Sequence, residues 1–103
     1  MTEEKKSAPS EEPTVEMFDD NGQKVIEELA KEYLTKGSWQ TIMFLYRERD
    51  SRTGEFGDPK VGIRRYQKYA GALKLRSKFN ISSQTQAKQI IDVLERWYPE
   101  THA

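Results

Sequence analysis

Apolar and polar positions alternate most regularly between residues 73 and 81. One phase of the alternation is apolar and contains Leu73, Leu75, Phe79 and Ile81. The other phase is mostly cationic and contains Lys74, Arg76, Lys78 and Asn80. A period of two residues is typical of a strand with one buried face. The pattern therefore predicts a strand whose apolar face belongs to the core and whose cationic face is exposed.

Two earlier segments are also predicted to be strands. Residues 39–50 begin with a β-prone apolar run and end in alternating charges. In residues 60–69 the two faces are formed by Val61, Ile63 and Tyr69 on one side, and by Arg64, Tyr66 and Lys68 on the other. Turn residues in segment 51–59 and at positions 70–71 predict the two reversals that connect these strands.

Apolar residues at helical spacing predict a helix at each end of the domain. Between residues 21 and 36 they are Val25, Ile26, Leu29 and Tyr33. After a serine cap at position 82 or 83 they are Ala87, Ile90, Ile91, Leu94 and Tyr98. Pro99 ends the second helix.

These elements together predict the fold class and the extent of the domain. We expect an α+β domain over residues 21–103, with an N-terminal helix, a curved antiparallel sheet of three or four strands, and a C-terminal amphipathic helix. Residues 1–20 are rich in Glu, Ser, Thr and Pro and predict a disordered acidic tail. A competing interpretation makes residues 64–79 a helix within a helix-turn-helix, but Gly71 would then lie in the helix interior.

Charge is segregated along a chain whose formal net charge is +0. Residues 1–37 carry five bases and ten acids, whereas residues 60–79 carry seven bases and no acid. The basic block also contains Tyr66, Tyr69 and Phe79. Cations next to aromatic rings suit a single-stranded nucleic acid, because phosphates bind Lys and Arg while exposed bases stack on rings. A solvated strand face is the alternative interpretation of the same charge run.

Most catalytic and metal-binding chemistry is absent from the sequence. The chain has no Cys, and its single histidine, His102, lies next to the C-terminus. The glycines match neither a phosphate-binding loop nor a dinucleotide fingerprint. We therefore expect no enzyme activity, no cofactor and no metal site. Lack of a signal peptide or of an apolar run long enough to span a membrane favours an intracellular protein.

The candidate nucleic-acid-binding residues follow from the predicted strands. Lys74, Arg76 and Lys78 would stand about 7 Å apart along one face of one strand. Arg64, Tyr66 and Lys68 would extend that surface onto the neighbouring strand, with the ring of Tyr66 stacking on a base. Tyr69 and Trp39 are lesser candidates for the same stacking role, but they and Phe79 are expected to pack in the core.

Three short motifs resemble the positive cofactor four family of transcriptional coactivators. They are Ile63-Arg64-Arg65-Tyr66, Gly71-Ala72-Leu73-Lys74 and Lys78-Phe79-Asn80-Ile81-Ser82, followed by a capped helix. The family implies a dimer whose curved sheets grip single-stranded or melted DNA, and it places Arg64, Tyr66, Lys74, Arg76 and Lys78 at the interface. The chain departs from the family at Leu75, where a proline is usual, and at Phe79-Asn80, where a glycine is usual. It also departs in having a predicted helix where the family has a further N-terminal strand.

The sequence therefore predicts a module that binds single-stranded nucleic acid without reading its sequence, as a transcription or DNA-maintenance accessory. Two alternatives remain open at this stage, a protein-interaction module with a basic sheet face and a small helix-turn-helix reader of duplex DNA. A homodimer is expected, because the second helix has a wider apolar stripe than one small sheet can cover.

Overall fold

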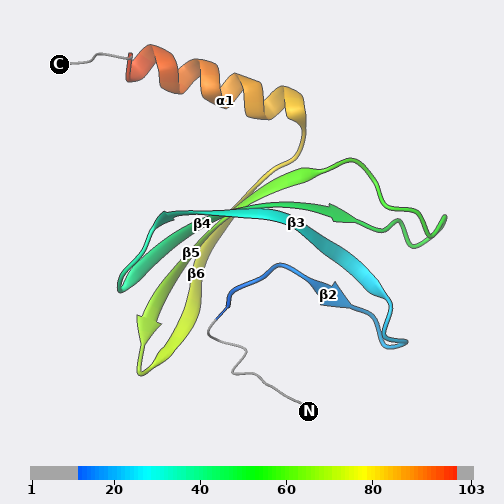
Figure 1. Cartoon of the computed structure of the whole chain (residues 1–103). Helices are drawn as coiled ribbons and strands as arrows, with labels where there is room; N and C mark the ends of the chain where they lie inside the picture. Colours follow the sequence, from blue (N-terminus) through cyan, green and yellow to red (C-terminus); the bar gives the residue numbers. More distant parts are fainter. Residues whose placement is uncertain (1–11, 100–103) are drawn as a thin grey trace.

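The computed structural model describes residues 12–99, which form one antiparallel sheet followed by a helix. The strands are β2 (Met17–Phe18), β3 (Lys24–Thr35), β4 (Trp39–Glu48), β5 (Lys60–Tyr69) and β6 (Ala72–Ile81), and the helix is α1 (Gln84–Trp97). The sheet order β2-β3-β4-β5-β6 follows the chain, so each strand pairs with its neighbours in sequence (Figure 1). The fold is thus mostly β, and the expectation of a sheet with three or four strands is wrong.

The N-terminal helix predicted over residues 21–36 is also wrong, since residues 24–35 form strand β3. The register with β4 runs from Glu28↔Tyr46 to Ala30↔Leu45, which leaves Leu29 as an extra, bulged residue. A bulge shifts the phase of side-chain alternation by one residue. Across the bulge, side chains on the same face are three residues apart instead of two. This irregular spacing of apolar residues resembles the spacing expected for a helix.

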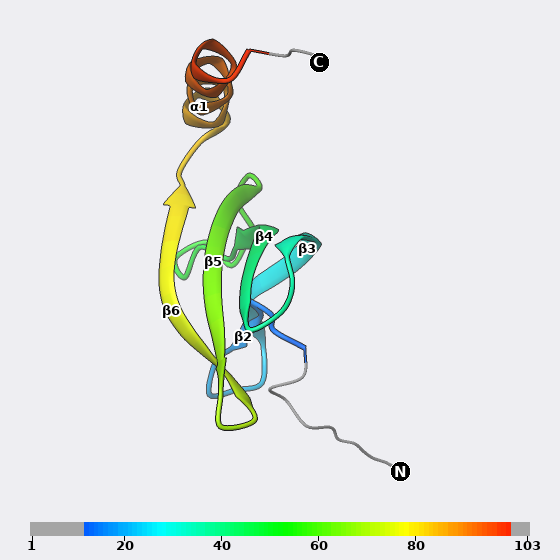
Figure 2. The ribbon, with the colours of Figure 1, turned by 90° about the vertical axis from the view of Figure 1, so that its left-hand side faces the viewer.

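The sheet is curled, and its core lies on the concave side (Figure 2). We define the concave face as the side that carries Ile42, Phe44, Tyr46 and Tyr66. Ile42 and Phe44 are completely buried, and Val15 from the segment before β2 packs on the same cluster. The single sheet is therefore covered by the chain's own N-terminal segment. The opposite side of the sheet is the convex face.

A second bulge decides which side chains of β6 share a face. Arg65 pairs with Ser77 but Tyr66 pairs with Leu75, so Arg76 is the extra residue. Leu73 packs against the concave core, whereas Ile81 pairs with Val61 on the convex side. The expectation that all apolar residues of this strand share one core face is wrong, because the bulge reverses the alternation halfway along the strand.

The last two connections form as predicted from local signals. Ala70 and Gly71 both have positive φ angles, 54° and 81°, as a tight hairpin turn between β5 and β6 requires. Ser83 caps α1 by accepting a hydrogen bond from the backbone N–H of Gln86 at 3.1 Å. The helix points away from the sheet, and none of its residues is buried (Figures 1 and 2).

The helix-turn-helix alternative is wrong, because residues 64–79 lie in β5 and β6. Residues 1–11 of the predicted acidic tail lie outside the described residues. Residues 12–20 differ from that prediction, since they cover the concave face and include β2. Between residues 12 and 99 no helix is both long enough and apolar enough to cross a lipid bilayer.

Candidate nucleic-acid interface

Cationic side chains from three strands face the concave side of the sheet. At one end of this face they are Lys31 from β3, Arg64 and Lys68 from β5, and Lys78 from β6. Arg64 and Lys78 are direct partners across the antiparallel pair β5–β6. Within residues 12–99, Arg64, Lys68 and Lys78 form no ion pair with a carboxylate.

The other end of the concave face is electrically neutralised. Lys60 bonds the carboxylate of Glu48 at 2.8 Å, and this hydrogen bond raises the pKa of the Lys60 ammonium. Lys24 pairs with Glu16 at 3.3 Å. As far as residues 12–99 are concerned, the positive charge without a carboxylate partner on this face is therefore concentrated on β5 and β6.

Tyr66 lies on the concave face, within the buried cluster, and is 8% exposed. Burial raises the pKa of its phenol, and the neighbouring Arg64 guanidinium partly opposes this shift. The Nε atom of Arg64 is buried and has no hydrogen-bond partner among residues 12–99. The predicted stacking ring thus belongs to the core cluster in this structure, next to a cationic group with unused hydrogen-bonding capacity.

Lys74 and Arg76 lie on the convex face, so the prediction that they share a face with Lys78 is wrong. Lys74 is the cross-strand partner of Gln67, and the Nε of Arg76 donates to the side-chain oxygen of Gln67 at 3.0 Å. Gln67 in turn pairs with Trp39, whose ring is on the convex side. The bulge at Arg76 separates these two cations from Lys78.

Three rings expected in the core are exposed instead. Trp39 is 38% exposed and Tyr69 is 59% exposed, and the guanidinium carbon of Arg65 lies 4.3 Å from the centre of the Trp39 ring. Phe79 is also exposed, at 54%. Tyr66 and Tyr69 are three residues apart on a regular strand, so they must face opposite sides. That signal was present in the sequence, but it did not reveal which side was covered.

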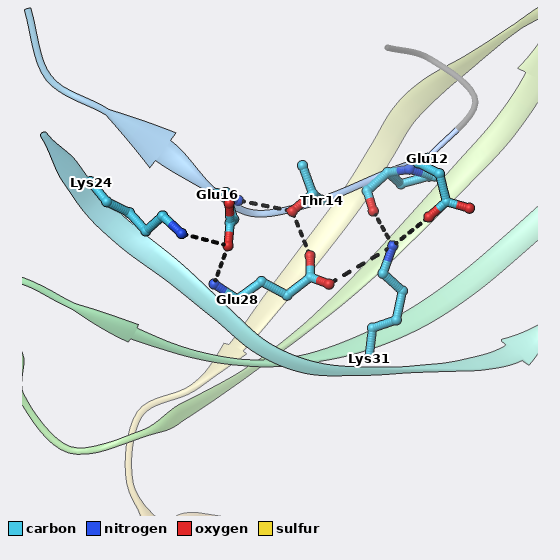
Figure 3. Close-up of polar contacts among 7 residues, drawn as sticks. Glu12, Thr14, Glu16, Lys24, Glu28 and Lys31 are labelled. Carbon is cyan, nitrogen blue, oxygen red and sulfur yellow. Dashed lines mark hydrogen bonds and ion pairs between the residues drawn. The ribbon is translucent and has the colours of Figure 1, made fainter. Parts of the chain in front are cut away.

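An extended acidic segment lies along β3 on the concave side. We call residues Glu12–Phe18 the strap. The ammonium of Lys31 donates to the Glu12 carboxylate at 3.2 Å and to the carbonyl oxygen of Pro13 at 2.6 Å. The Glu16 carboxylate accepts from Lys24 and from the backbone N–H of Glu28, at 3.3 and 3.2 Å (Figure 3).

Beyond the strap, the concave face opens into a hollow near the β5–β6 turn. Its volume is about 430 Å³, and its lining includes Glu12, Tyr33, Lys36, Lys68 and Leu73. Among residues 12–99, Glu12 is the one acid in this lining, which also contains two lysines and a tyrosine. The arrangement suits an anionic group attached to a flat ring.

No cluster of three or more His, Cys, Asp or Glu side chains suited to a metal ion occurs within residues 12–99. Comparisons of the chain with protein-family models, curated proteins and solved structures found no match.

Proposed function

We propose that the chain binds single-stranded nucleic acid along the concave face. Arg64, Lys68 and Lys78 contact phosphates, and Tyr66 stacks on a base. The observation that carries this proposal is the cross-strand pair of Arg64 and Lys78, which lacks a carboxylate partner within residues 12–99. Like charges directly opposite each other destabilise an antiparallel pair. An anionic ligand bound between the two cations attracts both of them, so their close placement becomes favourable.

The spacing along β5 favours a chain of phosphates over a single anion. Arg64, Tyr66 and Lys68 occupy every second position of the strand, so their side chains leave the same face about 7 Å apart. A ring between two cations contacts a base while the cations contact the flanking phosphates. Duplex DNA offers no unpaired base to such a ring, so we infer a preference for single strands.

The strand order adds support from the resemblance to the positive cofactor four family. Strands β3 to β6 followed by α1 supply the further N-terminal strand that the predicted helix had replaced. A role as a transcription or DNA-maintenance accessory inside the cell, without enzyme activity or a cofactor, is part of the same proposal. The protein-interaction alternative differs in expecting no affinity for oligonucleotides.

A titration with labelled single-stranded and duplex oligonucleotides of equal length, at two salt concentrations, tests the proposal. We expect tighter binding to the single strand, and an affinity that falls as salt rises. Equal or tighter binding to duplex contradicts the stacking role of Tyr66. Lack of affinity for both oligonucleotides favours the protein-interaction alternative.

We further propose a homodimer in which a second copy of the chain covers α1. Ile91, Leu94 and Trp97 are 49%, 46% and 70% exposed, and the sheet does not cover them. An apolar helix face of this size in contact with water is costly, whereas two copies can bury it against each other. Sedimentation equilibrium is expected to show twice the chain mass, and Leu94→Asp is expected to give the monomer. A wild-type chain that stays monomeric at micromolar concentration contradicts this proposal.

A further inference from the structure

The strap combines an apolar anchor with acidic groups placed on the proposed binding face. Val15 is 4% exposed and packs in the cluster that contains Phe44 and Tyr66. Pro13 is buried as well. Because Tyr66 is 8% exposed with this anchor in place, a base cannot stack on its ring until the strap leaves.

The polar groups of the strap hold positions that suit a bound polyanion. Glu12 and Glu16 place carboxylates 3.2 and 3.3 Å from the ammonium groups of Lys31 and Lys24. Lys31 is only 18% exposed and also lies 5.6 Å from the centre of the Phe44 ring. The strap is thus an extended chain whose carboxylates contact lysines and whose uncharged side chain, Val15, packs on the aromatic cluster. A bound single-stranded nucleic acid would place its phosphates and a base in a similar way.

The strap is held at the edge of the sheet. Strand β2 has two residues and, among the strands of residues 12–99, pairs with β3 alone, with an irregular register between Met17 and Phe18. These two side chains are 54% and 57% exposed. Strands β3 to β6 pair with one another without any contribution from the strap. The strap can therefore detach while the four long strands keep their hydrogen bonds.

We propose that the strap is an autoinhibitory segment that competes with single-stranded nucleic acid for the concave face. This inference rests on the proposed function, and it adds that the unliganded chain is mostly closed. Binding then requires an open state, and the apparent affinity falls in proportion to the population of that state. Val15 holds the strap closed over the cluster that contains Tyr66. Glu12 and Glu16 occupy Lys31 and Lys24, which lie on the same face as the proposed phosphate contacts.

A reversible lock on the strap tests this competition in the full chain. Met17 and Ile26 are backbone partners across β2 and β3. Such partners have Cα atoms about 4.5–5.5 Å apart, a distance that a disulfide can bridge. The chain has no cysteine of its own, so the Met17→Cys/Ile26→Cys variant contains a single possible disulfide. Position 17 is two residues from Val15, so the lock keeps the anchor within about 7 Å of its tether point.

The probe is a labelled oligothymidylate longer than the roughly 4–16 nucleotides that a comparable small β domain covers. We expect the oxidised lock to bind at least tenfold more weakly than the same protein after reduction. The matched control is Glu27→Cys/Arg47→Cys, which joins partners of β3 and β4 away from the strap. Its affinity is expected to be the same in both redox states.

A second full-chain variant, Val15→Gly, opens the strap without a lock. We expect it to bind the probe about tenfold more tightly than the parent chain. Equal affinity of the oxidised and reduced lock overturns the strap proposal while leaving the proposed function standing. The proposed function itself is overturned if none of three proteins binds the probe: the reduced lock, the parent chain and folded Val15→Gly. If Val15→Gly does not fold, the comparison of redox states still decides the question.

Discussion

The two faces of β5 and β6 provide a matched test of the proposed interface. Lys68 and Lys78 lie on the concave face, whereas Lys74 and Arg76 lie on the convex face. All four side chains are exposed, and all belong to the same hairpin. We expect Lys68→Ala and Lys78→Ala to weaken binding to a single-stranded oligonucleotide, and Lys74→Ala and Arg76→Ala to leave it nearly unchanged.

The expected magnitude follows from counterion release. Each phosphate contact contributes about 0.7 to the slope of log affinity against log salt for a single strand. Loss of one contact therefore costs about fivefold in affinity near 0.1 M salt, and loss of both contacts costs about 25-fold, on the same basis. Fluorescence anisotropy at several salt concentrations measures both the affinity and the slope.

Lys78→Ala is also expected to change stability: it should weaken binding but make the folded protein more stable. The substitution removes a like charge directly across from Arg64. Removal of such a pair is expected to raise the free energy of unfolding by about 0.2–1 kcal/mol, measured by denaturant titration. Equal losses of affinity for the concave and convex substitutions would refute the assignment of the interface to one face. A loss of stability in Lys78→Ala would refute the argument that the pair is retained for an anion.

Three further predictions concern the glycine in β5, the acidic N-terminus and the buried phenol. Gly62→Ala is expected to lower the free energy of unfolding by about 1–3 kcal/mol, because its Cβ would lie 3.2 Å from Cε1 of the Tyr46 ring; an unchanged thermal midpoint would show that the ring moves freely. Deletion of residues 1–11, which carry three acids and two bases, is expected to tighten oligonucleotide binding only slightly and only at low salt, because screening removes a diffuse charge effect. A gain that persists at high salt contradicts this. Burial raises the pKa of the Tyr66 phenol, so the folded state favours the neutral phenol. The stability that the buried neutral phenol contributes is therefore fully present below the ordinary tyrosine pKa of about 10, and it is lost as the pH rises above that value. Denaturant titrations across that range should show the loss in the parent chain and less of it in Tyr66→Phe.

Much of the strand arrangement could be predicted because its signals are local. The β-prone run in residues 39–48, the turn residues at 70–71 and the Ser83 cap each specify their own element. The structure confirms the strands at 39–48, 60–69 and 72–81 and the C-terminal helix at 84–97. In each case the residues that determine the element lie within it or next to it.

The bulges could not be predicted in the same way. A bulge at Leu29 or Arg76 is stabilised by the pairing of its strand with a neighbour, so the information lies partly in another segment. Each bulge changes which side chains share a face. The error over residues 21–36 and the incorrect grouping of Lys74 and Arg76 with Lys78 therefore have one physical cause.

The choice of the core face required knowledge of the strap. The convex face of β5 carries Val61 and Ile63, and the concave face carries Arg64 and Tyr66. Hydrophobicity alone favours the first pair as core. Val15 reverses this preference, because it lies on the concave side and packs in the same buried cluster as Tyr66. An acidic segment rich in Glu and Pro gave no sign that it contained such an anchor.

The segregation of charge along the chain is only partly cancelled in the folded structure. Glu12 and Glu16 neutralise Lys31 and Lys24 on β3, but their carboxylates form no ion pair with the cations of β5 and β6. Neither carboxylate reaches the cross-strand pair of Arg64 and Lys78, where two like charges lie directly opposite each other. Within residues 12–99, Arg64, Lys68 and Lys78 keep no carboxylate partner, and the proposed ligand extends farther across the sheet than the strap does. A longer polyanion can therefore make contacts that the strap lacks, and this difference in contacts provides free energy to displace it.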